Sequence, residues 1–220
     1  MILVIPDVLD ADTVKQVRAK LTTIKFVDGS ETAGEVARKV KNNLQADMSS
    51  PDYTQLNNSL LPIIANNSTF ESACLPMKFT RLRFSRYRDS MAYGAHIDAP
   101  MMGEIRSDIS FTLFLADPGE YDGGELVMQE PGGERAFKLQ PGHTIAYPST
   151  TLHRVAPVRR GERLVAFGWA QSLVRDAAHR ETLFDLHEAR TSLIARGGRE
   201  READLVGKSR SNLLRMWAEP

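Results

Sequence analysis

The chain has 220 residues, 42% apolar and 25% charged, and its 28 basic residues balance its 28 acidic residues to a formal net charge of zero. This composition is typical of a globular chain that buries a core of its own, and it excludes intrinsic disorder. The zero net charge argues against a dominant role in binding nucleic acid or a membrane surface.

The start of the chain and its single cysteine indicate the compartment. No run approaches the roughly 18 apolar residues of a membrane span. Residues 2–5 are apolar, but no basic region precedes them and Pro6 follows, so they predict a first strand rather than a signal peptide. Cys74 is the only cysteine, which excludes an intrachain disulfide and a thiolate metal cluster. We therefore expect a soluble, cytoplasmic protein whose Cys74 is partly buried.

Residues 1–76 are expected to form a helical support region. Asp10 is a suitable N-cap for a first helix, and the segment that starts at Pro51 has the proline typical of a first helical turn. A helix is also expected from residue 31 to about 47, because Val36, Val40 and Leu44 repeat at helical spacing among basic residues. A short helix over residues 69–74 completes this region.

Residues 77–175 have a different pattern. Short alternating or apolar runs follow one another, separated by Gly- and Pro-rich turns such as Asp117-Pro118-Gly119 and Pro131-Gly132-Gly133. Evenly spaced short strands predict a β-sandwich or a double-sheet jelly roll. The expected fold class is therefore α+β with a mainly β core, a double-stranded β-helix flanked by N-terminal and C-terminal helices.

Residues 176–220 return to helical periodicity, interrupted at Gly197-Gly198. The three regions are expected to fold as one cooperative unit, because no linker separates them. Two interpretations of the C-terminal helices stay open: they cap the barrel, or they form a subunit contact in a homo-oligomer.

The candidate chemistry begins at His96 and Asp98. In an extended chain, residues two apart point to the same face, so this imidazole and this carboxylate can serve one divalent metal. Of the other histidines, His153 opens an expected strand and is the best third ligand, whereas His143, His179 and His187 are read as structural. A jelly roll can bring distant strands together, and the resulting face of two histidines and one carboxylate is typical of non-haem Fe(II) oxygenases.

Arg163 lies ten residues after His153, at the start of an apolar run. If the strands that hold His153 and Arg163 run antiparallel through the intervening turn, the guanidinium points into the same barrel. A buried guanidinium requires an anionic partner, and its fork matches a carboxylate. The alternative is an exposed arginine after a turn.

Several segments together resemble the iron- and 2-oxoglutarate-dependent dioxygenases of the prolyl 4-hydroxylase type, and in particular the bacterial PKHD-type hydroxylases. They are residues 86–98, which contain His96-Ile97-Asp98, then Asp122-Gly123-Gly124-Glu125-Leu126, residues 147–155 and Trp169-Ala170-Gln171-Ser172. The resemblance runs from about residue 80 to 190, and the combination is more specific than any one motif.

The resemblance implies Fe(II) held by His96, Asp98 and His153, with Arg163 binding the distal carboxylate of 2-oxoglutarate. Tyr87, nine residues before the first metal histidine, is implied as a second contact to that carboxylate, with a core tyrosine as the alternative. Further implied are O2 as cosubstrate, L-ascorbate as a reductant of stray Fe(III), and a peptidyl or small-molecule substrate.

Two other classes of function stay open at this point. A cupin-like barrel with the same ligands could hold zinc or manganese for hydrolysis or isomerisation, although this gives Arg163 no role. A non-enzymatic binding module on the same fold is the third interpretation.

Overall fold

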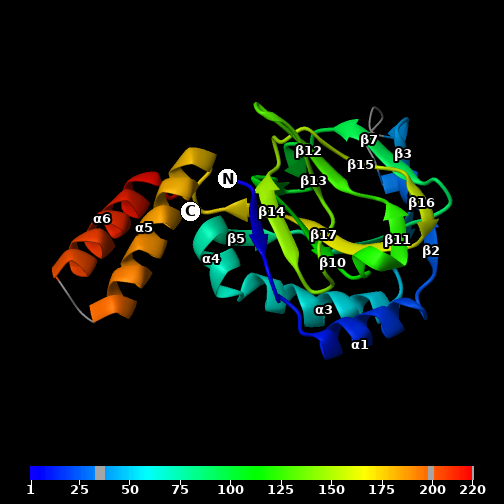
Figure 1. The fold of residues 1–220 in the computed structure, drawn as a ribbon, viewed down its shortest axis with the longest axis horizontal. Coiled ribbons are helices and arrows are strands. Elements are labelled where there is room, and N and C mark those ends of the chain that lie inside the picture. Colours follow the sequence, from blue (N-terminus) through cyan, green and yellow to red (C-terminus); the bar gives the residue numbers. More distant parts are fainter. Residues whose placement is uncertain (33–37, 198–200, 220) are drawn as a thin grey trace.

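A computed structural model describes residues 1–32, 38–197 and 201–219. Its core consists of two antiparallel sheets that face each other as a double-stranded β-helix, with helices packed against the larger sheet (Figure 1). This is the mainly β jelly roll that the regular turns of the sequence predict.

The larger sheet has the order β1-β14-β10-β17-β6-β4-β2, and β5 also pairs with β17. Its strands are β1 (Leu3–Ile5), β2 (Phe26–Asp28), β4 (Leu44–Ala46), β5 (Pro76–Phe79), β6 (Arg83–Tyr87), β10 (Ile109–Phe114), β14 (Thr144–Pro148) and β17 (Arg163–Ser172). The long strand β17 lies between β10 and β6. Its almost continuous burial explains why its sequence is apolar on both faces.

The smaller sheet has the order β13-β12-β15-β7-β3. Its strands are β3 (Lys41–Asn42), β7 (Ala92–His96), β12 (Leu126–Glu130), β13 (Gly133–Phe137) and β15 (His153–Val155). Two short strand pairs complete the barrel, β11 (Tyr121–Gly123) with β16 (Val158–Gly161) and β8 (Met101–Met102) with β9 (Ile105–Arg106). The 3-10 turns η1 (Gly29–Thr32) and η2 (Pro118–Glu120) connect strands.

The N-terminal helices are α1 (Ala11–Leu21), α3 (Pro51–Ala65) and α4 (Ser68–Cys74). As predicted, Asp10 is the N-cap of α1, where its carboxylate accepts a 2.7 Å hydrogen bond from the Thr13 amide. The Tyr53 ring of α3 meets Phe84 of β6 edge-on at 6.0 Å between centroids. The helices thus seal one face of the larger sheet and leave the interior between the sheets to the site.

The helix expected over residues 31–47 is wrong over residues 41–46. Residues 41–42 and 44–46 form strands β3 and β4, and Val36 lies outside the described residues. The four-residue spacing of Val40 and Leu44 is an even number, so it fits a strand as well as a helix. The buried polar side chains of Asn43 and Gln45 decide the outcome, because both donate hydrogen bonds to the Ser85 hydroxyl of β6. The N-terminal region is therefore helical only in part.

The C-terminal helices α5 (Ala177–Gly197) and α6 (Arg201–Trp217) lie side by side and project from the barrel next to α4 (Figure 1). His179 of α5 stacks on Trp217 of α6 at 4.0 Å between ring centroids. Neither helix contributes a residue to the cavity described below, so the pair does not cover that cavity. Nowhere in the three described stretches is a helix both long enough and apolar enough to cross a membrane.

Candidate metal centre

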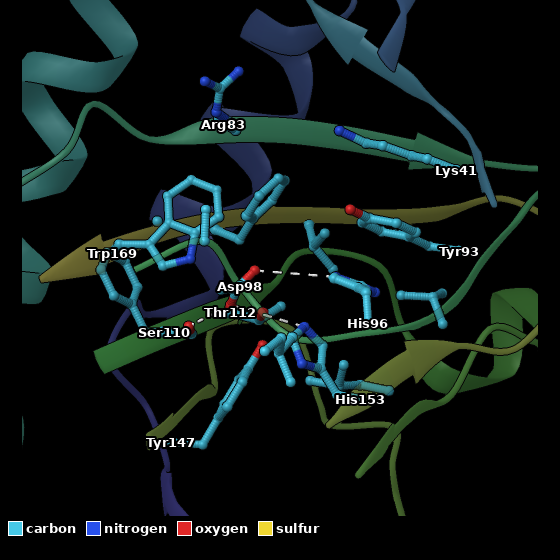
Figure 2. Close-up of a pocket in the computed structure, with 18 of the residues that line it drawn as sticks. Lys41, Arg83, Tyr93, His96, Asp98, Ser110, Thr112, Tyr147, His153 and Trp169 are labelled. Carbon is cyan, nitrogen blue, oxygen red and sulfur yellow. Dashed lines mark hydrogen bonds and ion pairs between the residues drawn. The ribbon is translucent and has the colours of Figure 1, made fainter. Parts of the chain in front are cut away.

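The predicted metal residues meet inside the barrel. His96 ends β7 and His153 begins β15, and the two stand directly opposite each other in the antiparallel ladder. Asp98 follows His96 by two residues and turns to the same side (Figure 2). One ligand atom from each of the three residues lies within 4.8 Å of the others. The fold therefore brings two imidazoles and one carboxylate into a cluster that can hold a single cation.

Hydrogen bonds to backbone carbonyls set which ring nitrogen of each histidine carries a proton. Nδ1 of His96 lies 2.8 Å from the Gly94 carbonyl oxygen, and Nδ1 of His153 lies 2.9 Å from the Thr151 carbonyl oxygen. A carbonyl oxygen only accepts, so each Nδ1 carries the proton. Both Nε2 lone pairs are left to face Asp98, from which they are separated by 4.0 and 3.9 Å. The hydrogen bonds from Nδ1 to the two carbonyl oxygens are of the kind that orients metal-binding imidazoles from the side of the ring away from the metal.

The carboxylate of Asp98 is held in the same way. Its Oδ2 accepts a 2.5 Å hydrogen bond from the Ser110 hydroxyl of β10, and Ser110 lies 2.8 Å from the Ser149 hydroxyl. Burial, followed by the proximity of His153, lowers the pKa of His96 to about 4. His96 is consequently neutral at pH 7, which is the form that donates a lone pair to a metal.

The triad opens onto a cavity of about 440 Å³ between the two sheets. Arg163 lies at its inner end, is 2% exposed, and has its guanidinium carbon 5.2 Å from the Tyr87 ring centroid and 5.5 Å from that of Phe114. Tyr87 and Arg163 are direct partners in the β6–β17 ladder. The structure thus brings both residues expected to contact 2-oxoglutarate to one end of the cavity that holds the triad.

Two polar groups at or beside Arg163 have no hydrogen-bond partner among the described residues. They are Nε of Arg163 and the hydroxyl of Tyr121, both buried. Burial raises the pKa values of Tyr87, Tyr121 and Tyr147, which keeps the three phenols neutral and able to donate. Because an unsatisfied buried donor is costly, a charged guanidinium beside neutral phenols fits a carboxylate brought in by a ligand.

The route from His153 to Arg163 differs from the predicted hairpin. Strand β15 belongs to the smaller sheet and β17 to the larger one, so their strands do not pair with each other. Between them, β16 pairs with β11 and carries the chain across the barrel to Gly161, whose φ of +73° suits glycine. Arg163 still faces the cavity, because it enters from the opposite sheet.

The structure explains why position 124 of the Asp122-Gly123-Gly124 segment is a glycine. A Cβ on Gly124 would lie 2.8 Å from Cγ2 of Val158 and 3.1 Å from Cδ of Arg163, and its φ is +69°. A side chain at this position would press on the stem of Arg163. The absence of a side chain at Gly124 therefore leaves space for the side chain of Arg163.

Several cavity residues were not singled out from the sequence. Ser110 and Thr112 alternate as polar residues within the otherwise apolar strand β10, a pattern that could have indicated an inward-facing polar pair. Tyr121, which lies beside Arg163 but does not line the cavity, carries no such local signal. His143 lies outside the cavity with Nε2 3.4 Å from Asp7, and Cys74 is buried with its pKa raised to about 12 by burial, so both are structural as expected.

Comparisons with known proteins agree with this architecture. Residues 82–171, which contain the triad and Arg163, match the 2OG-Fe(II) oxygenase superfamily. A crystal structure of a Pseudomonas putida prolyl-4-hydroxylase superposes with a TM-score of 0.54 at 21% identity, covering 78% of this chain and 92% of that one. An oxidoreductase of the 2OG-Fe(II) oxygenase family from Burkholderia pseudomallei gives a TM-score of 0.59 at 16% identity, covering 77% and 85%. The fold is thus that of the 2OG-Fe(II) oxygenases.

Closer relatives define the family. A PKHD-type hydroxylase of Gloeothece citriformis is 48% identical over 221 residues, and one of Maricaulis maris is 46% identical over 219 residues, each covering 100% of both chains. The chain belongs to the PKHD-type hydroxylases, within the 2OG-Fe(II) oxygenase superfamily. It is accordingly an oxidoreductase, and the hydrolase, isomerase and non-enzymatic interpretations are set aside.

Proposed function

We propose that this chain hydroxylates its substrate with Fe(II), 2-oxoglutarate and O2, using His96, Asp98 and His153 as iron ligands and Arg163 as the anchor of 2-oxoglutarate. The observation that carries the proposal is the convergence of these four side chains on one cavity. Imidazole and carboxylate donors suit Fe(II), and three protein ligands leave coordination positions for a cosubstrate.

The protein's part in the metal site is to keep three donors in place. The Gly94 and Thr151 carbonyl groups hold the imidazoles with Nε2 inward, and Ser110 holds the Asp98 carboxylate. Fe(II) held by these donors would supply the site at which O2 is activated, while oxidation of 2-oxoglutarate and of the substrate C–H bond would each supply two of the four electrons that O2 takes up. The net reaction consumes 2-oxoglutarate, O2 and a C–H bond, and it yields succinate, CO2 and the hydroxylated product.

The 2-oxoglutarate end of the site is assigned to Arg163, with Tyr87 and Tyr121 as neutral donors beside it. The guanidinium is 2% exposed, and its ionic contact with a carboxylate would be strengthened by exclusion of water. Tyr87 lies directly across the ladder from Arg163. This geometry supports a contact to the same carboxylate, rather than a purely structural role for the Tyr87 ring.

A reducing compartment suits this chemistry. The cytoplasm keeps thiols reduced, which fits the free buried thiol of Cys74. We propose that the enzyme works there, with L-ascorbate or an equivalent reductant returning stray Fe(III) to Fe(II). The substrate is a peptidyl group or a small molecule that fits the cavity in front of the triad.

The test is an anaerobic titration of Fe(II)-loaded protein with 2-oxoglutarate, followed by the visible metal-to-ligand charge-transfer band. We expect the band to appear in the unmodified protein and to be lost in His153→Ala. His143→Ala is the matched control, because His143 is a half-buried histidine outside the cavity. A folded, iron-loaded protein that gives no band with 2-oxoglutarate contradicts the proposal.

A further inference from the structure

The outer half of the cavity contains a second group of cationic and aromatic side chains. Figure 2 shows Lys41 and Arg83 on the side away from His153, with Tyr93 and Trp169 between them and the metal triad. Arg163 serves the inner end, so these two cations are additional to the proposed 2-oxoglutarate site.

The two cations come from opposite sheets. Lys41 of β3 pairs with Tyr93 of β7 in the smaller sheet, and its ammonium lies 5.5 Å from the Tyr93 ring centroid. Arg83 begins β6 in the larger sheet and pairs with Phe167 of β17. Along β6, Arg83 falls on the same face as Tyr87, four residues later, and that face points into the barrel. Each sheet therefore contributes one cation to the lining of the cavity.

The surroundings of Arg83 suit an anion. Among the described residues its guanidinium forms no ion pair; Nη1 lies 3.8 Å from the Met48 sulfur, and Cζ lies 6.0 Å from the Trp169 ring centroid. Burial lowers the pKa of Arg83. A half-buried guanidinium beside a thioether and a ring gains more from a carboxylate than one that is fully hydrated.

A third donor faces the same space. The indole Nε1 of Trp169 is buried and has no hydrogen-bond partner within the described part of the chain, although Trp169 lines the cavity. Asp98 supplies the sole carboxylate among the described residues of the cavity lining, and it belongs to the metal triad. The polar groups of the outer half are thus mainly donors, and its walls are the rings of Tyr93, Phe167 and Trp169.

We propose that the substrate carries a carboxylate that binds between Lys41 and Arg83, while its apolar or aromatic body lies against Tyr93 and Trp169 on the way to the metal. This inference rests on the proposed function, because it assigns the outer half of the same cavity to the substrate. It follows from the chemistry of the lining: two cations and an indole N–H select an anionic group, and three rings select an apolar body.

The experiment compares two probes of the same shape. Calorimetry under anaerobic conditions measures the binding of 3-phenylpropionate and of 3-phenylpropionamide to protein saturated with Fe(II) and 2-oxoglutarate. The charge-transfer band is recorded in the same samples, so displacement of 2-oxoglutarate by a probe would be seen. We expect the carboxylate to bind about a hundredfold more tightly than the amide, the combined effect of two charge-assisted contacts of about tenfold each.

Variants locate the contact. Arg83→Gln and Lys41→Gln should each lower carboxylate affinity about tenfold while changing amide affinity less than about twofold, and Arg83→Lys should restore part of the loss. Arg86→Gln is the matched control, because Arg86 is a half-buried arginine on the opposite face of β6, 3.1 Å from Glu162. The band and the melting temperature of each variant report whether its fold is intact.

The outcomes separate the two proposals. If the band forms but the two probes bind equally or not at all, or if Arg83→Gln behaves like Arg86→Gln, the carboxylate subsite is overturned and the proposed function stands. If wild-type protein gives no band, the proposed function fails and the subsite fails with it. A blocked tripeptide with a central Glu, compared with its Gln counterpart, distinguishes a peptidyl carboxylate from a free small acid. Tighter binding of the Glu tripeptide than of 3-phenylpropionate would indicate a peptidyl substrate, and the reverse would indicate a small acid.

Discussion

The inner and outer halves of the cavity are built in different ways. In the inner half, His153 lies on a strand flanked by two others and Arg163 on the long strand β17, and the metal ligands each have a fixing hydrogen bond. In the outer half, Lys41 lies on the two-residue edge strand β3, whereas Arg83 begins β6, which is flanked by β17 and β4, just as Arg163 begins β17. The inner half is assigned to the iron and 2-oxoglutarate, which are the same in every turnover, and the outer half is assigned to the substrate.

This difference indicates where each kind of specificity resides. Groups that bind iron and 2-oxoglutarate must be held in place before binding, since loose ligands weaken both affinity and rate. Groups at an edge strand can be exchanged without disturbing the barrel. Changes to the inner half should therefore abolish cosubstrate or metal binding, whereas changes to the outer half should alter the choice of substrate.

The largest effect is expected from Asp98→Ala. Removing the carboxylate takes one of three donors from the triad, so Fe(II) affinity should fall by more than about a hundredfold. Anaerobic equilibrium dialysis measures the bound iron. Asp7→Ala, at an exposed carboxylate paired with His143 outside the cavity, is the control that should retain iron. Unchanged iron occupancy in Asp98→Ala would remove Asp98 from the ligand set.

Arg163→Leu should weaken 2-oxoglutarate binding about tenfold to a hundredfold while iron remains bound, because a charge-assisted contact is lost. The thermal stability of the protein, in contrast, should not fall. A buried cation without a bound carboxylate is costly, so the melting temperature without 2-oxoglutarate should stay level or rise. The titration of the charge-transfer band and a thermal melt measure the two quantities. An unaltered affinity for 2-oxoglutarate would exclude the assigned role.

Ser110→Ala tests the support of the metal site rather than the site itself. The Ser110 hydroxyl donates to Asp98 at 2.5 Å, and its loss leaves the carboxylate free to turn, so Fe(II) affinity should fall about tenfold. Ser72→Ala removes a buried hydroxyl that donates to the Thr69 carbonyl in α4, away from the cavity, and should leave iron affinity unchanged. Equal iron affinity in the two variants would show that Ser110 does not hold the ligand.

The inner half could be predicted from the sequence because its signals are local. His96 and Asp98 are two residues apart in an extended segment, so alternation places them on one face. Arg163 opens a strand that is apolar on both faces, so its assignment depends on the resemblance to the dioxygenases. Alternation does not predict which strands pair with each other. The β15 and β17 strands were expected to pair, and they lie in different sheets because β16 pairs with β11.

The outer half could not be predicted in this way. Lys41 stood within an expected surface helix, where a lysine is read as solvated, and the valine and leucine spacing around it fits two periods equally. Only tertiary structure buries its neighbours Asn43 and Gln45 against Ser85 and directs Lys41 inward. Long-range pairing overrides local propensity there.

The smallest expected effect concerns pH and the carboxylate probe. Burial, followed by the nearby charge of Arg83, lowers the pKa of Lys41 to about 8, while the charges of Asp28 and Asp98 act in the opposite direction. Above pH 8 the free protein loses the Lys41 proton, and a carboxylate must then bind together with a proton. Probe affinity should therefore decline by up to about tenfold per pH unit, until the higher pKa of the bound state is reached.

Lys41→Arg separates this titration from others in the cavity, since a guanidinium keeps its charge over the whole range. The variant should bind 3-phenylpropionate with an affinity that is nearly constant from pH 7 to about 9, as measured by calorimetry at each pH with 2-oxoglutarate present. The amide probe carries no charge, so its affinity should not depend on pH in either protein. If wild type and Lys41→Arg decline in parallel, another group titrates, and the ammonium of Lys41 does not contact the carboxylate.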